Sequence, residues 1–115
     1  MLESLSLEGK SVVITGGGTG LGRAMVRDMA RAGANLVIAG RRTGPIEEAA
    51  TEAISLGVDA TFVATDVTDS SQVANLMKTC LNRFGKIDVL LNNAGAVSDN
   101  VRKPIWEHTD EEWDR

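Results

Sequence analysis

Four short runs of apolar residues divide the chain, and the stretches between them carry apolar residues at helical spacing. The runs are VVI, LVIA, TFVA and IDVLL, at residues 12–14, 36–39, 61–64 and 87–91. Short apolar runs bounded by turn residues are typical of strands, whereas apolar positions three and four residues apart are typical of helices. The order is therefore β-α-β-α-β-α-β, an alternation that predicts an α/β fold with a parallel sheet covered by helices.

The three predicted helices have recognisable starts and stops. The first is expected over residues 21–31 and the second over residues 45–56, each followed closely by a glycine. In the third, Asp69 and Gln72 form a capping-box pair at the start of the helix, and Gly85 ends it.

The last residues, EHTDEEWDR at 107–115, resemble the start of a fourth helix. Thr109 and Glu112 form a second capping-box pair there. A helix nucleus with nothing to propagate it is unfavourable, so we expect the sequence to be part of a larger domain. No linker, repeat or change of composition divides residues 1–115, which are predicted to be a partial single domain, truncated before its second half.

Composition and charge exclude several classes of protein. Hydrophobic residues make up 43% of the 115 residues and charged residues 24%, as in ordinary globular domains. The formal net charge of −4 argues against a nucleic-acid partner, which normally needs a basic stripe. There is no secretory signal and no apolar run near the roughly 18 residues of a membrane span, so we expect a cytoplasmic protein without a membrane partner. One cysteine and one histidine give no predicted metal site.

The segment TGGGTGLG, at residues 15–22, lies between the first strand and the first helix and holds five glycines in seven residues. The first N–H groups of a helix are unpaired and lie at the positive end of its dipole, which favours an anion. Glycine lets a phosphate oxygen approach the backbone where a Cβ would block it. The segment therefore predicts a phosphate-binding turn.

Spacing discriminates between the known glycine-rich nucleotide motifs. A P-loop is excluded because GKS, at residues 9–11, precedes the strand instead of following it. The G-x-G-x-x-G fingerprint fails because Leu21 stands where its last glycine is required. G-x-G-x-G matches from Gly18 to Gly22 and is also used by methyltransferases that bind S-adenosylmethionine. Those enzymes normally need an acidic residue at the end of the second strand, where this chain has AGRR at 39–42.

The turn does match T-G-x-x-x-G-x-G at residues 15–22. Together with DV at 66–67 and NNAG at 92–95, it makes the whole chain resemble the short-chain dehydrogenase/reductase family. The resemblance implies a Rossmann-like doubly wound parallel sheet, here incomplete: β-α-β-α-β-α-β and the start of a fourth helix. It also implies a nicotinamide dinucleotide bound across the carboxyl ends of the strands.

By this resemblance each motif has a part of the cofactor to bind. The backbone at residues 19–21 holds the pyrophosphate, Gly22 allows close packing of helix on strand, Asp66 and Val67 meet the adenine edge, and residues 93–95 line the nicotinamide-side ribose. Two alternatives remain open: a helix or turn cap for the aspartate and a plain turn for NNAG. The implied cofactor-binding residues are Gly16, Thr19, Gly20, Leu21, Gly22, Arg41, Arg42, Asp66, Val67, Asn93, Ala94 and Gly95.

The end of the second strand bears on cofactor choice. NAD-binding relatives typically place an aspartate there, and this chain has Gly40. Arg41 and Arg42 follow, and a guanidinium can pair with a 2′-phosphate through two parallel hydrogen bonds. We therefore expect NADP to be preferred, with NAD as the alternative; solvated loop charges are the other interpretation of the arginines.

The family's catalytic groups, a serine and a Tyr-x-x-x-Lys pair, have no counterpart here, because the sequence contains no tyrosine. They are expected beyond Arg115, so no catalytic residue is assigned. The resemblance implies an oxidoreductase acting on a small carbonyl or alcohol substrate and, when complete, a homo-oligomer. The chain alone, with IDVLL as an exposed edge strand, is expected to be marginally stable and inactive. The alternative is a non-catalytic dinucleotide-binding or partner-binding half-domain, or a decayed fragment.

Overall fold

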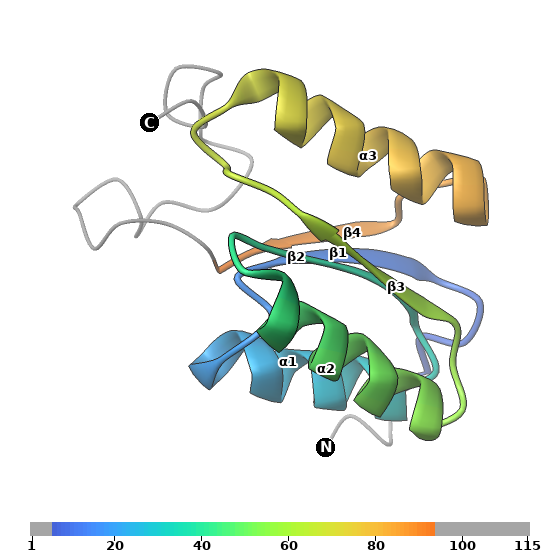
Figure 1. The fold of residues 1–115 in the computed structure, drawn as a ribbon. Helices are drawn as coiled ribbons and strands as arrows, with labels where there is room; N and C mark the ends of the chain where they lie inside the picture. Colours follow the sequence, from blue (N-terminus) through green and yellow to red (C-terminus); the bar gives the residue numbers. More distant parts are fainter. Residues whose placement is uncertain (1–5, 94–115) are drawn as a thin grey trace.

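The computed structural model describes residues 6–93, which form a parallel four-stranded sheet with helices on both faces (Figure 1). The strands are β1 (Ser11–Thr15), β2 (Asn35–Gly40), β3 (Ala60–Ala64) and β4 (Val89–Asn92). The helices are α1 (Gly20–Arg31), α2 (Thr43–Ser55) and α3 (Ser70–Phe84). Helices α1 and α2 cover one face of the sheet and α3 covers the other. The predicted element order and the doubly wound α/β class are confirmed.

The strand order, β3-β2-β1-β4, reverses direction at β1. The chain first moves outward from β1 to β2 and β3, and α3 then returns it to β4 on the other side of β1. In an open sheet of this kind, ligands bind outside the carboxyl ends of the strands at the point of reversal. That point lies here between the carboxyl ends of β1 and β4.

The two central strands are buried on both faces. Val12 and Ile14 of β1 belong to the core cluster under α1 and α2, whereas Val13 packs with Leu76 and Cys80 of α3. Each fully buried aliphatic side chain stabilises the fold by about 1.5–3 kcal/mol. A strand with helices on both faces needs apolar side chains on both, which explains why continuous apolar runs mark these strands.

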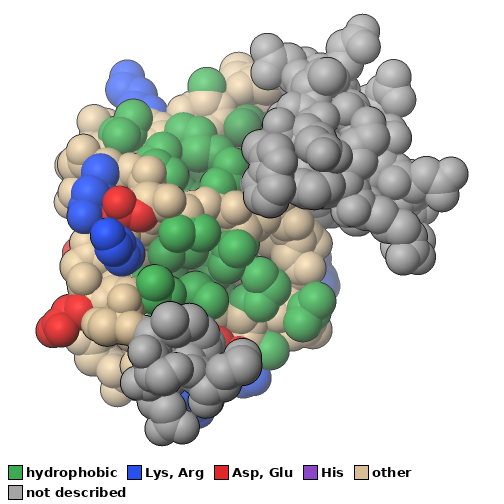
Figure 2. All heavy atoms as spheres, turned by 180° about the vertical axis from the view of Figure 1, so that it is seen from behind, with side chains coloured by type: hydrophobic (Ala, Val, Ile, Leu, Met, Phe, Trp, Pro, Cys, Tyr) green, Lys and Arg blue, Asp and Glu red, His purple; other side chains and the backbone are tan. Residues whose placement is uncertain are grey.

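Strand β4 is one of the two edge strands of the sheet that residues 6–93 form, as predicted for IDVLL, and β3 is the other. All four of its residues are only half-buried. Val89 and Leu91 pack against the core cluster on one face and Leu90 against the cluster on the other. The strand lies toward the rear in Figure 1, and the rear view of Figure 2 shows hydrophobic side chains gathered on that side of the molecule.

The helix boundaries differ slightly from the predicted ones. Helix α1 begins one residue early, at Gly20, while α2 begins at Thr43 instead of Pro45 and ends at Ser55 instead of Leu56. A proline is tolerated throughout the first turn, because the N–H groups there have no partner within the helix. No helix within residues 6–93 has the length and apolar character needed to cross a membrane.

The start of α3 corrects one detail of the predicted capping box. Asp69 caps the helix as expected, and its carboxylate accepts from the N–H groups of Ser71 and Gln72. The side-chain oxygen of Gln72, however, accepts from the N–H of Asp66 at 2.8 Å instead of reaching back to that of Asp69. The Asp69 N–H donates to the Asp66 carbonyl at 3.0 Å, so it is already satisfied. Gly85 ends the helix in the left-handed conformation, as predicted.

A three-residue ion cluster joins α1 to α2. The two carboxylate oxygens of Glu52 accept from Nε of Arg23 at 2.8 Å and from Nε of Arg27 at 2.7 Å. These hydrogen bonds, that of Arg27 foremost, hold the pKa of Glu52 below its ordinary value of 4.5. A carboxyl group whose pKa is lowered by folding stabilises the folded state above its unfolded pKa, and that stabilisation is lost as the pH falls through the folded pKa.

We therefore expect Glu52→Gln to lower the free energy of unfolding of the full-length protein by about 1 kcal/mol at pH 7, since both pairs are partly exposed. Urea unfolding of the variant and the wild type measures this difference in free energy. Below pH 4.5 the difference from the wild type should shrink as Glu52 itself becomes protonated. Glu48→Gln is the matched control, because Glu48 is exposed on the same helix and forms no ion pair within residues 6–93. A difference that persists unchanged into acid would contradict the assignment.

Candidate functional site

The turn after β1 leaves the start of α1 open on one side. Thr19 is the N-cap of the helix and its side chain makes no capping hydrogen bond. The N–H groups of residues 20–22 have no hydrogen-bond partner within residues 6–93, and the first helical bond is from the N–H of Arg23 to the carbonyl of Thr19. Thr19 and Gly20 are exposed, and the Leu21 side chain is 68% exposed. The predicted pyrophosphate segment therefore presents unpaired donors at an open surface.

The five glycines of the turn serve two different purposes. Gly16 and Gly20 have positive φ angles of 67° and 57°, which side chains rarely adopt. The others are needed because neighbouring atoms are close: a Cβ at Gly17 would lie 2.7 Å from Ile38, and one at Gly18 would lie 2.7 Å from Pro45. A Cβ at Gly22 would overlap the carbonyl oxygen of Gly16. Nothing lies within 4 Å of a Cβ built on Gly20, so the open space is at the helix start.

Asp66 follows the end of β3 with one side-chain oxygen occupied and the other available. Its Oδ1 accepts from the N–H of Thr68 at 2.9 Å, from the hydroxyl of Thr68 at 2.6 Å and from Nη2 of Arg41 at 3.3 Å. The Thr68 hydroxyl is the main cause of a lowered pKa, which keeps the Asp66 carboxylate ionised and able only to accept. Neither Oδ2 of Asp66 nor the N–H of Val67 has a partner within residues 6–93.

This arrangement bears on both interpretations of Asp66. The bonds from Thr68 form a local turn, so the alternative of a turn cap is correct for Oδ1. The remaining Oδ2 and the Val67 N–H are a free acceptor beside a free donor. An adenine edge offers the complementary pair, an exocyclic amine next to a ring nitrogen.

Two side chains that the sequence interpretation did not assign to the site hold this loop in place. The Thr68 hydroxyl fixes the Asp66 carboxylate, and the Gln72 side chain accepts from the Asp66 N–H while donating to Asp69 at 3.2 Å. The signal for Thr68 was available in the sequence, because an aspartate followed two residues later by threonine is a common turn pattern. The Gln72 contact could not be distinguished from a capping box by spacing alone.

Arg41 and Arg42 lie between the end of β2 and the start of α2. The Arg41 side chain is 70% exposed, and its ion pair with Asp66 joins two predicted site residues from neighbouring strand ends. Arg42 is exposed and is the N-cap of α2, without a side-chain capping bond. Gly40 is half-buried, and its carbonyl accepts from the N–H of Thr65 at 2.8 Å, which ties the ends of β2 and β3 together.

Asn93 is held against the glycine turn. Its N–H bonds to the carbonyl of Thr15 at 3.2 Å and to the Thr15 hydroxyl at 3.1 Å, and its side-chain amide reaches the carbonyl of Gly16 at 3.5 Å. The Thr15 hydroxyl in turn donates to the side-chain oxygen of Asn92 at 2.7 Å. The first and fourth strand ends are thus joined at the reversal of the sheet. Ala94 and Gly95 lie outside the described residues.

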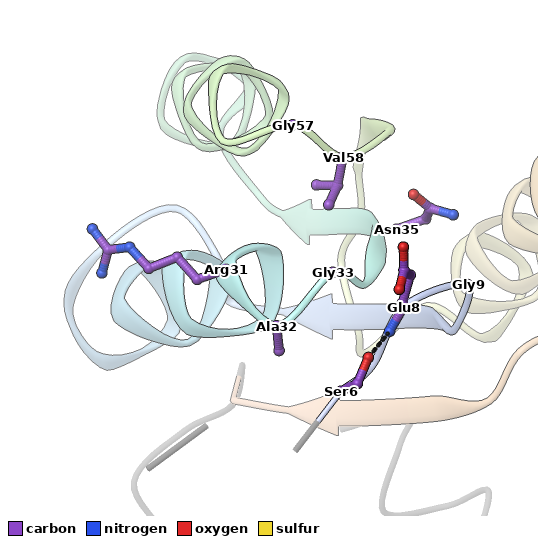
Figure 3. Close-up of a pocket in the computed structure, with 9 residues that line it drawn as sticks. All are labelled: Ser6, Glu8, Gly9, Arg31, Ala32, Gly33, Asn35, Gly57 and Val58. Atoms are coloured by element: carbon purple, nitrogen blue, oxygen red, sulfur yellow. Dashed lines mark hydrogen bonds between the residues drawn. The ribbon is translucent and has the colours of Figure 1, made fainter. Parts of the chain in front are cut away.

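A separate groove of about 490 Å³ lies at the opposite side of the sheet, near the amino ends of the strands (Figure 3). It is formed by segments that precede the strands, including Gly9 before β1 and Val58 before β3. Its charged residues are Glu8 and Arg31, and the Arg31 side chain points away from the other residues drawn. None of the predicted site residues lines this groove. The candidate site is therefore the side of the sheet formed by the carboxyl ends of the strands, called the carboxyl edge below. The glycine turn, the Asp66 loop and Asn93 all lie there.

Comparison with known proteins gives consistent matches. A family model described as short chain dehydrogenase matches residues 10–115. The chain is 42% identical over 113 residues to an uncharacterized oxidoreductase of Thermotoga maritima, covering 95% of this chain and 41% of that protein. It is 40% identical over 98 residues to 1-deoxy-11-beta-hydroxypentalenate dehydrogenase of Streptomyces arenae, covering 85% of this chain and 34% of that protein.

The solved structures agree with the sequence relatives. A hydroxysteroid dehydrogenase from Escherichia coli superposes with a TM-score of 0.78 at 31% identity, over 84% of this chain and 41% of that one. A short-chain type dehydrogenase/reductase from Mycobacterium ulcerans gives a TM-score of 0.77 at 26% identity, over 82% of this chain and 35% of that one. The chain thus spans 41% or less of the length of each of these four proteins.

Proposed function

Since this chain belongs to the short-chain dehydrogenase family, we propose that it forms the cofactor-binding part of an NADP-preferring oxidoreductase. Residues 1–115 are proposed as part of one Rossmann-fold dinucleotide-binding domain. The observation that carries the proposal is the carboxyl edge of the sheet. There the unpaired N–H groups of residues 20–22, the free acceptor of Asp66, the N–H of Val67 and the Arg41 guanidinium all lie on neighbouring strand ends.

Each group at this edge fits one part of the dinucleotide. The N–H groups at the start of α1 bind the pyrophosphate, with Gly16 and Gly20 giving the turn its shape. Oδ2 of Asp66 accepts from the adenine amine while the Val67 N–H donates to the ring. Asn93, with Ala94 and Gly95, lines the nicotinamide-side ribose. The proposed site comprises Gly16, Thr19, Gly20, Leu21, Gly22, Arg41, Arg42, Asp66, Val67, Asn93, Ala94 and Gly95.

The preference for NADP rests on the two arginines. Arg41 uses one of its five N–H donors on Asp66 at 3.3 Å, and its side chain is largely exposed, so other donors face solvent. Arg42 stands at the adjacent N-cap of α2. A 2′-phosphate bound there gains charge-assisted hydrogen bonds that NAD cannot make. Asp66 keeps the guanidinium beside the adenosine end of the site.

The reaction proposed for the full-length protein is hydride transfer between NADP(H) and a small carbonyl or alcohol compound. The nicotinamide ring supplies the hydride chemistry, and the residues of this chain bind and orient it. No residue of this chain is assigned a proton-transfer role, because the sequence has no tyrosine. Those groups are proposed to lie in the part of the relatives that this chain does not span. A cytoplasmic homo-oligomer is the form we propose for the full-length protein.

Deuterium transfer tests the proposed reaction. The full-length protein is incubated with NADPH deuterated at the transferring position of the nicotinamide and with a panel of ketones and aldehydes, and the alcohols are analysed by mass spectrometry. Deuterated product is the expected result. If NADPH fluorescence reports binding and no carbonyl compound gains deuterium, the chain is a dinucleotide-binding module without this activity. If NADPH does not bind, the proposal is wrong.

A further inference from the structure

The end of β2 is packed against the first turns of α2 so closely that Gly40 has no room for a side chain. A Cβ on Gly40 would lie 2.7 Å from Cγ2 of Ile46. Carbon atoms attract each other best at about 3.5–4.0 Å, so one of the two would have to move. Gly40 has no positive φ that would demand glycine. The glycine is therefore required by Ile46 alone.

Ile46 cannot easily move aside. It is 1% exposed and belongs to the core cluster beneath α1 and α2. A β-branched side chain in a helix has one strongly preferred χ1 rotamer, so Cγ2 cannot rotate away at low cost. Protein interiors are packed about as densely as organic crystals, so the neighbours of Ile46 leave little free space. The helix itself is held as well, because its Pro45 lies against the glycine turn at Gly18, where a Cβ would be 2.7 Å from that of the proline.

The position of Gly40 matters for the cofactor, on the basis of the proposed function. In dinucleotide-binding folds, a carboxylate at this place accepts hydrogen bonds from the adenosine ribose hydroxyls, whereas an arginine accommodates a 2′-phosphate. We infer that Ile46 is a positioning residue that determines cofactor specificity: by filling the space beside Gly40 it keeps a carboxylate out of the ribose site. Arg41 is then the charged side chain that follows the strand. Packing in the core, as well as charge at the surface, thus sets the preference for NADP over NAD.

Four full-length variants test this inference: Gly40→Asp, Gly40→Ala, Ile46→Leu and the double variant Gly40→Asp/Ile46→Leu. Leucine keeps the volume of isoleucine and lacks Cγ2. Both single Gly40 variants are expected to lower Tm by about 5 °C, because they overpack a dense core. Ile46→Leu alone should change Tm by less than about 3 °C. The double variant should regain most of the loss in Tm.

The specificity readout is the ratio of the Kd for NADH to the Kd for NADPH, from fluorescence titration. Gly40→Asp alone should bind both cofactors weakly, and the double variant should favour NADH by about tenfold relative to the wild-type ratio. A double variant that folds where Gly40→Asp does not would support the inference in the same way. Gly44→Ala is the control for adding a Cβ, because nothing lies within 4 Å of that position.

Two results would overturn the inference. One is a Gly40→Asp variant that keeps the wild-type Tm and gains NADH binding without a change at Ile46. The other is a double variant that regains Tm and still prefers NADPH, because the space beside Gly40 would then not govern the preference. The proposed function fails separately, through a wild-type protein that binds neither cofactor.

Discussion

Replacing Gly22 by alanine is expected to disrupt the start of α1 and to abolish dinucleotide binding. The added Cβ would overlap the carbonyl oxygen of Gly16 and lie 2.9 Å from the side-chain amide of Asn93. The first obstacle is backbone, held by the positive φ of Gly16, so the helix itself must move off the turn. We expect the free energy of unfolding of the full-length protein to fall by about 3 kcal/mol, measured by urea unfolding.

Gly44→Ala is the matched control for Gly22→Ala. Gly44 also lies in the first turn of a helix, α2, but a Cβ there would meet nothing within 4 Å and its φ is not positive. Alanine should stabilise that helix by about 0.5–1 kcal/mol. If Gly22→Ala unfolds like the wild type and still binds NADPH, the close packing of α1 on the turn is not what the site requires.

Arg41→Ala is expected to weaken the binding of NADPH by about tenfold and that of NADH by less than about twofold. A hydrogen bond to a charged group contributes about 1.5–3 kcal/mol, and we take the lower value because the side chain is 70% exposed. Fluorescence titration of the full-length protein with each cofactor gives the two Kd values. The loss for NADPH should shrink at high salt, because exposed charges are screened.

Arg31→Ala provides the control for Arg41→Ala. Arg31 is also exposed, but it lies at the opposite edge of the sheet, beside the groove of Figure 3. Its removal should leave both Kd values unchanged. Equal losses for NADPH and NADH in Arg41→Ala would show that the guanidinium does not meet a 2′-phosphate.

Most of the fold could be predicted because its signals are local. The strands of a sheet covered on both faces are continuous apolar runs, and β1 and β2 are buried as that pattern requires. The start of α2 was misplaced because proline fits any position of a first helical turn. The reasons for Gly17 and Gly18 could not be predicted, since these glycines are required by Ile38 and Pro45, which are distant in sequence.

The candidate site was predictable in its residues and less so in its contacts. The motifs at residues 15–22, 66–67 and 92–93 do meet at one edge of the sheet, because parallel strands end together there. The ion pair of Arg41 with Asp66, 25 residues apart, and the support of Asp66 by Thr68 depend on side-chain geometry that spacing does not encode.

Calorimetric titration of the full-length wild-type protein with NADP⁺ and NAD⁺ in parallel at low salt tests the proposed cofactor site most directly. Both dinucleotides are expected to bind, NADP⁺ about tenfold more tightly through the bonds of Arg41 to the 2′-phosphate. Equal or tighter binding of NAD⁺ would contradict the assignment of the arginines. Binding of neither dinucleotide would contradict the assignment of the carboxyl edge as a cofactor site.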